Sequence, residues 1–101
     1  MKRLRVSHQA KRDLGDIWRY VANDADSIEV ADRIVESVTT RFAMLAQQPH
    51  AGRSREDIDP GVRSFPSGNY LIYYRESKSH LVISRVLHAK RDQRGAWNKA
   101  E

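Results

Sequence analysis

The chain has 101 residues, of which 40% are hydrophobic and 31% charged, with no cysteine and a formal net charge of +5. This length allows one hydrophobic core and is too short for two, so we expect a single domain over residues 1–101. The lack of cysteine excludes disulfides, thiolate metal sites and a cysteine nucleophile. No apolar run follows the basic N-terminus, so we expect no signal peptide, no membrane contact and a cytoplasmic location.

A short strand and a helix are predicted at the start of the chain. Apolar and polar residues alternate near residues 3 to 7, which is the pattern of a strand with one buried face. Ser7 suits the N-cap of a helix whose apolar residues line one face and which ends near Asn23. Gly15 lies inside this helix at a cost of about 1 kcal/mol relative to alanine, which indicates either close packing or simple tolerance.

A second helix is predicted after a short turn. Asp26 and Glu29 have the form of a capping box, and Ser27 is the alternative cap. One face of the helix stays apolar until Pro49 ends it. The residues of that face are Ala31, Ile34, Val35, Val38, Phe42 and Leu45. The two helices should therefore form an antiparallel hairpin with a common apolar surface.

Three strands are predicted after a loop. Residues 49 to 61 have turn chemistry, and Pro60 and Gly61 fit the centre of a type II turn. Alternating segments then predict strands at residues 62 to 66, 69 to 76 and 80 to 88. The expected fold class is α+β, in which an N-terminal strand and the two-helix hairpin pack with a mostly antiparallel four-stranded sheet, followed by a short C-terminal helix or tail.

The last strand is predicted to have two apolar faces. Strict alternation places Leu81, Ile83, Arg85 and Leu87 on one face. Two helices can cover one face of a sheet, so the uncovered face is interpreted as a binding surface for another chain. The alternative is that the C-terminal segment folds back over this face using Trp97.

The positive charge lies mostly in the second half of the chain. Residues 50–101 carry 10 basic and 6 acidic side chains, whereas residues 1–49 carry 8 and 7. Such an excess favours an acidic partner, which can be nucleic acid, a nucleoprotein machine or an acidic peptide. A basic solvated face is the alternative interpretation.

Three segments resemble motifs of the RelE/ParE toxin superfamily. The first is SHQAKRDLGDIWRYV at residues 7 to 21, which is similar to the opening Ser-x-x-Ala-x-x-Asp-Leu-x-x-Ile-Trp-x-Tyr. The second is PHAGRSREDIDPGVRSFPSGNYLIYYR at residues 49 to 75, with a Pro-x-x-Gly-Arg loop and an Arg-Ser-Phe-Pro strand. The third is RVLHAKRD at residues 85 to 92, in which Lys90 replaces the more usual arginine. Their order and spacing cover most of the chain.

This resemblance implies the toxin of a type II toxin–antitoxin system. A ParE-like member inhibits DNA gyrase and cell growth, and a RelE-like member cleaves messenger RNA on the ribosome; the segments favour ParE. The implied partner is an acidic, ParD-like ribbon-helix-helix antitoxin, which forms a hetero-oligomer with the toxin and provides its indirect link to DNA. The antitoxin-binding residues are predicted as Leu81, Ile83, Arg85 and Leu87. The target-binding residues are predicted as His88, Lys90, Arg91, Arg94 and Trp97.

An enzymatic function is the alternative. Metal-free RNA cleavage needs a general base, a general acid and cations around the phosphate. The candidates for these roles are Arg63, Arg85, His88 and Lys90. The ribonuclease members place a tyrosine, or a histidine with a tyrosine, at the end of the sheet, and this chain lacks that tyrosine, so we expect no catalytic residue.

Other chemistry finds little support in the sequence. The four histidines lack metal-ligand spacing and no Gly-rich phosphate loop follows a strand, so no metal site and no cofactor are expected. A nucleic-acid-binding module remains a third possibility because Tyr70, Tyr73 and Tyr74 lie among basic residues. His88 is also interpretable as a hydrogen-bonded strand end, and Arg63 and Arg75 as ordinary surface charges.

Overall fold

The computed structural model describes residues 2–91 and 93–98 of the chain. Their elements confirm the α+β class and, in chain order, are β1 (Arg3–Val6), α1 (His8–Ala25), α2 (Ile28–Gln47), the 3₁₀ turn η1 (Pro49–Ala51), β2 (Arg53–Ser54), β3 (Arg63–Ser67), β4 (Tyr70–Glu76), β5 (His80–His88) and α3 (Gln93–Asn98). The sheet order is β1-β5-β4-β3-β2, with β1 parallel to β5 and the other pairs antiparallel.

The prediction of four strands was wrong by one. The additional strand, β2, has two residues inside the segment that was expected to be a loop, where Arg53 pairs with Ser64 and Ser54 with Arg63. Two residues are too few to show a period of two, so the sequence pattern contains no signal for this strand.

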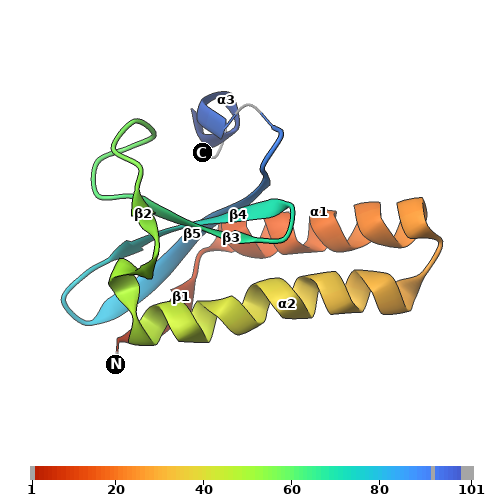
Figure 1. Ribbon diagram of the computed structural model, residues 1–101, viewed down its shortest axis with the longest axis horizontal. Coiled ribbons are helices and arrows are strands. Elements are labelled where there is room, and N and C mark those ends of the chain that lie inside the picture. Colours follow the sequence, from red (N-terminus) through yellow and green to blue (C-terminus); the bar gives the residue numbers. More distant parts are fainter. Residues whose placement is uncertain (1, 92, 99–101) are drawn as a thin grey trace.

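Figure 1 shows the arrangement in three layers. The α1–α2 hairpin covers one face of the sheet, and α3 lies on the opposite side. The larger core lies between the hairpin and the sheet and includes Val38, Phe42 and Leu45 from α2, as predicted. The smaller core lies under α3, where Ala96 and Trp97 pack against Val62, Tyr73 and Leu87.

Two serines begin the long helices. The hydroxyl of Ser7 accepts the Ala10 N–H at 3.0 Å, as predicted, and it also donates to the Ser84 carbonyl at 3.0 Å, which ties the start of α1 to β5. At α2 the alternative cap is the correct one, because Ser27 accepts the Val30 N–H. Asp26 instead ends α1 in the left-handed conformation, at φ 50°.

Gly15 is tolerated in α1 and is not required there. A Cβ atom at this position would lie 3.6 Å from the Arg19 guanidinium, which is ordinary contact with a flexible side chain. We therefore expect Gly15→Ala to raise the free energy of unfolding by about 0.5 to 1 kcal/mol through the lower backbone entropy of the unfolded chain. Urea unfolding monitored by circular dichroism measures this, and a lower midpoint than wild type would contradict it.

A β-bulge in β5 changes the faces of that strand. Tyr73 pairs with Arg85 and Tyr74 with Ile83, so Ser84 is an extra residue without a partner on β4. As a result Leu81 and Ile83 belong to the core under the helix hairpin, whereas Leu87 belongs to the core under α3. The prediction of one common face was therefore wrong, because an extra residue reverses the alternation beyond it.

The C-terminal segment covers the second face of the sheet, which confirms the alternative interpretation of Trp97. Its indole ring lies 5.8 Å from the Tyr73 ring, and the Tyr73 hydroxyl donates to the Gln93 side-chain carbonyl at 2.6 Å. The sheet is therefore covered on both sides where the second core lies. An uncovered apolar face for a partner is not present there.

Candidate functional site

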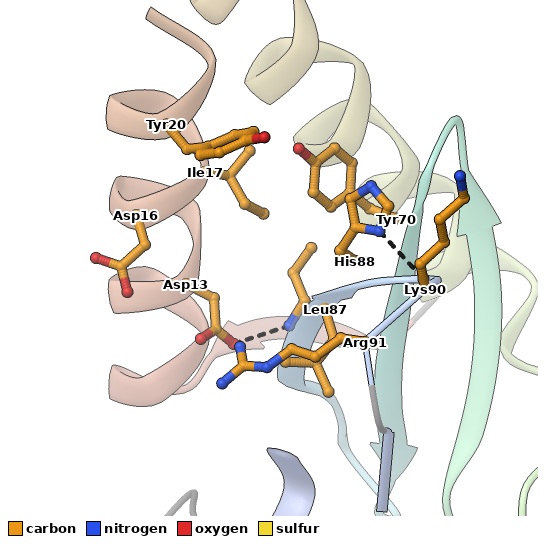
Figure 2. Close-up of a pocket in the computed structure, with 10 residues that line it drawn as sticks. Asp13, Asp16, Ile17, Tyr20, Tyr70, Leu87, His88, Lys90 and Arg91 are labelled. Carbon is orange, nitrogen blue, oxygen red and sulfur yellow. Dashed lines mark hydrogen bonds between the residues drawn. The ribbon is translucent and has the colours of Figure 1, made fainter. Parts of the chain in front are cut away.

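The candidate site is a pocket of about 460 Å³ between α1 and the ends of β4 and β5. This volume lies within the range of about 300 to 1,000 Å³ that is usual for ligand sites. Figure 2 shows its lining, which combines a hydrophobic base with aromatic and charged walls. The lining residues are Asp13, Asp16, Ile17, Tyr20, Tyr70, Val86, Leu87, His88, Lys90 and Arg91.

A buried ion pair supports one wall of this pocket. Arg85 donates to both oxygens of Asp13, from Nε at 2.8 Å and from Nη2 at 2.9 Å, and both side chains are 6% exposed. Asp13 also accepts the Val86 N–H at 2.9 Å, and Arg85 donates to the Ala96 carbonyl at 2.9 Å. The pair therefore joins α1, β5 and α3.

The aromatic wall consists of Tyr20, Tyr70 and His88. Tyr20 is 64% exposed, whereas Tyr70 is buried and its ring meets the His88 ring edge-on at 5.3 Å. Burial raises the pKa of the Tyr70 hydroxyl, which therefore stays protonated at neutral pH. His88 Nδ1 accepts the Lys90 N–H at 3.1 Å, which orients the ring.

The charges that remain unpaired at this pocket are positive. Asp13 is neutralised by Arg85, and Asp16 forms an ion pair with Arg19 at 2.5 Å. Lys90 and Arg91 are exposed, and neither has a carboxylate partner among residues 2–91 and 93–98. The pocket therefore suits a group that combines apolar or aromatic surface with negative charge.

The structure divides the predicted target-binding residues between two places. His88, Lys90 and Arg91 line the pocket. Arg94 and Trp97 lie on the other side of the sheet, where Arg94 donates to the Asp57 carbonyl at 3.0 Å and the indole N–H of Trp97 donates to the Asp59 carboxylate at 3.3 Å. Lys99, which the sequence suggested as part of the same basic tail, is outside the described residues.

The predicted antitoxin-binding residues are inside the protein. Leu81 and Ile83 are fully buried under the helix hairpin, and Leu87 is buried under α3. Arg85 is held by Asp13 and by the Ala96 carbonyl. Their exposure was predicted from strict alternation, and both the bulge and the α3 cover overturn it.

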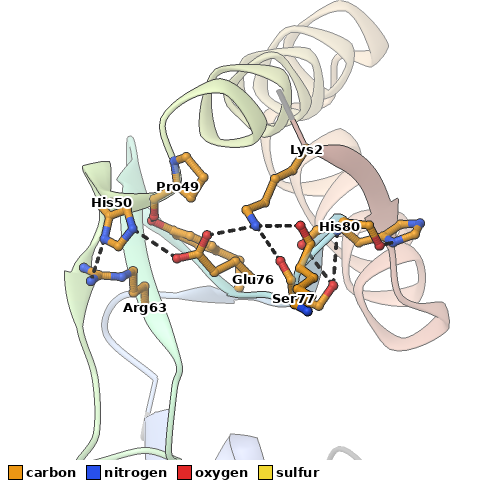
Figure 3. A network of polar contacts seen from close by, with 10 residues as sticks. Lys2, Pro49, His50, Arg63, Glu76, Ser77 and His80 are labelled. Atoms are coloured by element: carbon orange, nitrogen blue, oxygen red, sulfur yellow. Dashed lines mark hydrogen bonds and ion pairs between the residues drawn. The ribbon is translucent and has the colours of Figure 1, made fainter.

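A second polar network holds the segment after α2 against the sheet, as Figure 3 shows. Arg63 donates to the Gly52 carbonyl at 2.8 Å and lies 3.1 Å from His50 Nδ1. His50 Nε2 lies 3.1 Å from the Glu76 carboxylate, which is also 3.5 Å from the Lys2 ammonium. Arg63 is thus bound to backbone and histidine, whereas Arg75 has the acidic partner expected of a surface charge, in Asp59 at 2.6 Å.

The four residues that the ribonuclease alternative requires do not converge. Arg63 is part of the network around His50, and Arg85 is buried in its pair with Asp13. His88 and Lys90 are at the pocket. A phosphate at the pocket would therefore meet neither arginine in the arrangement that this chemistry needs.

The described part of the chain contains no group of three or more His, Asp or Glu side chains that could hold a metal ion. Among the same residues, no helix is both long and apolar enough to cross a membrane.

Sequence reasoning missed Asp13, Tyr20 and Tyr70 as parts of the site. Asp13 was not named as a site residue, and the signal that could have identified it is its position one turn from the apolar Ala10 and Ile17. Tyr20 and Tyr70 lie 50 positions apart in the sequence, and the fold alone brings them to one pocket.

The fold and the site define a small α+β protein with a helix hairpin on one face of its sheet and a pocket with cationic residues at its rim. A family described as ParE toxin of type II toxin-antitoxin system, parDE, matches residues 4–93. The chain therefore belongs to the ParE toxin family of type II toxin–antitoxin systems.

Individual relatives agree with this assignment. The chain is 33% identical over 94 residues to Toxin ParE1 of Caulobacter vibrioides, covering 93% of this chain and 96% of that protein. It is 31% identical over 90 residues to Toxin RelE3 of the same organism, covering 88% and 96%. A solved structure titled Chromosomal ParDE TA system from P. aeruginosa has a TM-score of 0.78 at 22% identity, covers 89% of this chain and 98% of that one, and supports the fold.

Proposed function

We propose that this toxin arrests growth in the cytoplasm by binding DNA gyrase and is neutralised by a cognate antitoxin. The observation that carries the proposal is the separation of Arg63, Arg85 and His88, because a ribonuclease needs its cations and proton-transfer groups around one phosphate. Binding and trapping a target has no such requirement. Family membership supports the toxin part of this proposal.

The proposed contact surface for gyrase is the pocket rim. His88, Lys90 and Arg91 offer positive charge beside the exposed Tyr20 ring. A partner side chain that buries its apolar part in the pocket and keeps a negative group at the rim would use both features. Arg94 and Trp97 are engaged by the 57–59 loop and are better explained as holding α3 in place.

The proposed antitoxin is an acidic, ParD-like ribbon-helix-helix protein that forms a hetero-oligomer with this chain. Its contacts cannot be the side chains of Leu81 and Ile83 unless the helix hairpin moves, since both are fully buried. We therefore propose that exposed basic residues of the second half, including Lys90 and Arg91, attract its acidic segment.

Supercoiling by purified gyrase tests the function. The wild-type chain should inhibit supercoiling, and the neighbouring gene product should restore it. The double variant Lys90→Gln, Arg91→Gln should weaken inhibition about 5- to 30-fold, because two rim contacts are typically worth about 1 kcal/mol each. The matched control is Arg33→Gln, Lys78→Gln, which removes two exposed charges elsewhere and should leave inhibition unchanged.

The second candidate function is ribosome-dependent messenger cleavage, and the identity to Toxin RelE3 is the observation that favours it. Cleavage of messenger RNA that disappears in His88→Ala, with supercoiling unaffected by the wild-type chain, would replace the gyrase proposal. Deleting α3 does not separate the two functions, since this deletion exposes the core around Val62, Tyr73 and Leu87.

A further inference from the structure

The start of the chain is strongly basic, although the net charge of the first half as a whole is close to zero. Residues 2–12 include five lysines and arginines and no acidic residue. Residues 13–49 include three basic and seven acidic residues. The small net charge of the first half therefore results from two segments of opposite sign.

Four of these cations are exposed at the start of the chain, and we call the exposed surface of this segment the basic edge: Arg3, Arg5, Lys11 and Arg12. Arg3 and Arg5 belong to β1, which is the outermost strand of the sheet on its side. Lys11 and Arg12 lie on the solvent side of the first turns of α1, between the buried Ala10 and Asp13. Ser7 alone separates the strand from the helix.

The cations of the basic edge are free within the protein. None of them has a side-chain hydrogen bond or ion pair to any of residues 2–91 or 93–98. Lys2 differs, because it binds the Glu76 carboxylate and the carbonyls of Ser77 and Lys78. It is therefore not part of the surface.

This placement of charge does not help the fold. The first turn of α1 contains no acidic residue, although the N-terminal end of a helix favours negative charge. Lys11 and Arg12 instead add positive charge to the positive end of the helix dipole, close to Arg5 in the chain. An anionic partner would turn this repulsion into attraction.

The chemistry of the basic edge fits a phosphate backbone. Arg3 and Arg5 project on the same side of β1 and about 6.7 Å apart along it, a separation similar to that of successive phosphates on one nucleic-acid strand. The surface has no aromatic side chain on which unpaired bases could stack, apart from the His8 ring next to it. Its one large exposed apolar side chain is Leu4, at 43%, so it offers little to anchor an acidic peptide.

The far end of the helix hairpin has the opposite charge. Asp24, Asp26 and Glu29 are exposed around the turn between α1 and α2, and the part of α1 between Arg12 and Asp24 is about 18 Å long. Figure 1 shows this turn at the opposite end of the hairpin from the N-terminus. A polyanion would therefore be attracted to one end of the hairpin and repelled from the other.

We propose that the basic edge of this toxin binds the phosphate backbone of double-stranded DNA without sequence specificity. The toxin would then contact DNA directly, beyond the indirect contact through an antitoxin that the resemblance implies. The inference does not depend on gyrase binding, since its surface and its test involve neither gyrase nor the pocket.

The test measures binding of the full chain to a short duplex DNA at several salt concentrations. Each phosphate neutralised contributes about −0.9 to the slope of log K against log salt, so the four cations predict a wild-type slope of about −3 to −4. The variant Arg5→Gln, Lys11→Gln, Arg12→Gln should make the slope shallower by about 2 to 3. The control Arg33→Gln, Arg53→Gln, Lys78→Gln removes the same charge from exposed positions elsewhere and should keep the wild-type slope.

Circular dichroism confirms that each variant is folded. An unchanged slope in the first variant, or an equal change in both, would overturn the proposal. Poly-glutamate and single-stranded RNA are tested at the same salt concentration. If either binds more tightly than the duplex, and its binding is weakened in the first variant, the surface belongs to an acidic protein or to RNA and the DNA proposal is overturned. Loss confined to duplex binding in the first variant supports it.

Discussion

Replacing Arg85 with methionine is expected to lower the free energy of unfolding by about 3 to 5 kcal/mol. The substitution leaves the Asp13 carboxylate buried without its cation and removes the hydrogen bond to the Ala96 carbonyl. Urea unfolding at neutral pH measures the loss, which should appear as a lower midpoint with an unchanged slope.

The matched control is Arg19→Met. Arg19 also forms an ion pair with an aspartate on α1, Asp16, but both side chains are about two thirds exposed, so the expected loss is about 0 to 1 kcal/mol. The double variant Asp13→Leu, Arg85→Met should be more stable than Arg85→Met, because it removes the uncompensated charge. Equal losses in Arg85→Met and Arg19→Met would show that the buried pair does not support the fold.

The variant Gly52→Ala is expected to be destabilised by about 1 to 3 kcal/mol or more, because it overfills a tightly packed position. The new Cβ would lie 2.5 Å from the Tyr74 hydroxyl oxygen and 2.7 Å from the Ser64 carbonyl oxygen, and the second of these is backbone and cannot rotate away. The Gly52 N–H also donates to Tyr74 at 2.9 Å, and its carbonyl accepts from Arg63. Burial raises the pKa of Tyr74, so its hydroxyl remains a neutral partner at neutral pH.

Gly15→Ala is the matched control for Gly52→Ala, because its Cβ meets a flexible side chain at 3.6 Å and the variant should be stabilised. Thermal or urea unfolding of both variants gives the comparison. A gain in stability in both variants would contradict this prediction. It would mean that the segment after α2 can move away from the sheet and make room for the new Cβ atom.

The sequence was sufficient where local patterns act alone. The faces of α1 and α2, the Ser7 cap and four of the five strands follow from periodicity and cap chemistry, and all are present. The sequence was insufficient for the faces of β5, since the extra residue Ser84 leaves no trace in a pattern of alternating residues. The same bulge, with α3, determines which predicted site residues are buried.

The site was predictable in part. His88, Lys90 and Arg91 were identified from the basic C-terminal motif, and the structure brings them to one pocket. Arg85 was interpreted as exposed because its partner Asp13 lies 72 residues away, and no local pattern reports a pairing of that separation. Arg94 and Trp97 were grouped with the pocket residues by proximity in sequence, whereas α3 turns them toward the opposite side of the sheet.

The parallel pairing of β1 with β5 has a consequence for synthesis on the ribosome. Arg3 pairs with His80, and the Ser7 hydroxyl bonds to the Ser84 carbonyl 77 residues later. At a translation rate of about 5 to 20 residues per second, the residues of β5 that pair with β1 are synthesised about 4 to 15 s after β1. Until then the nascent chain can form its helices but lacks the sheet, the buried Asp13–Arg85 pair and the pocket. The complete sheet, with β1 at its edge, therefore forms only after β5 has been translated.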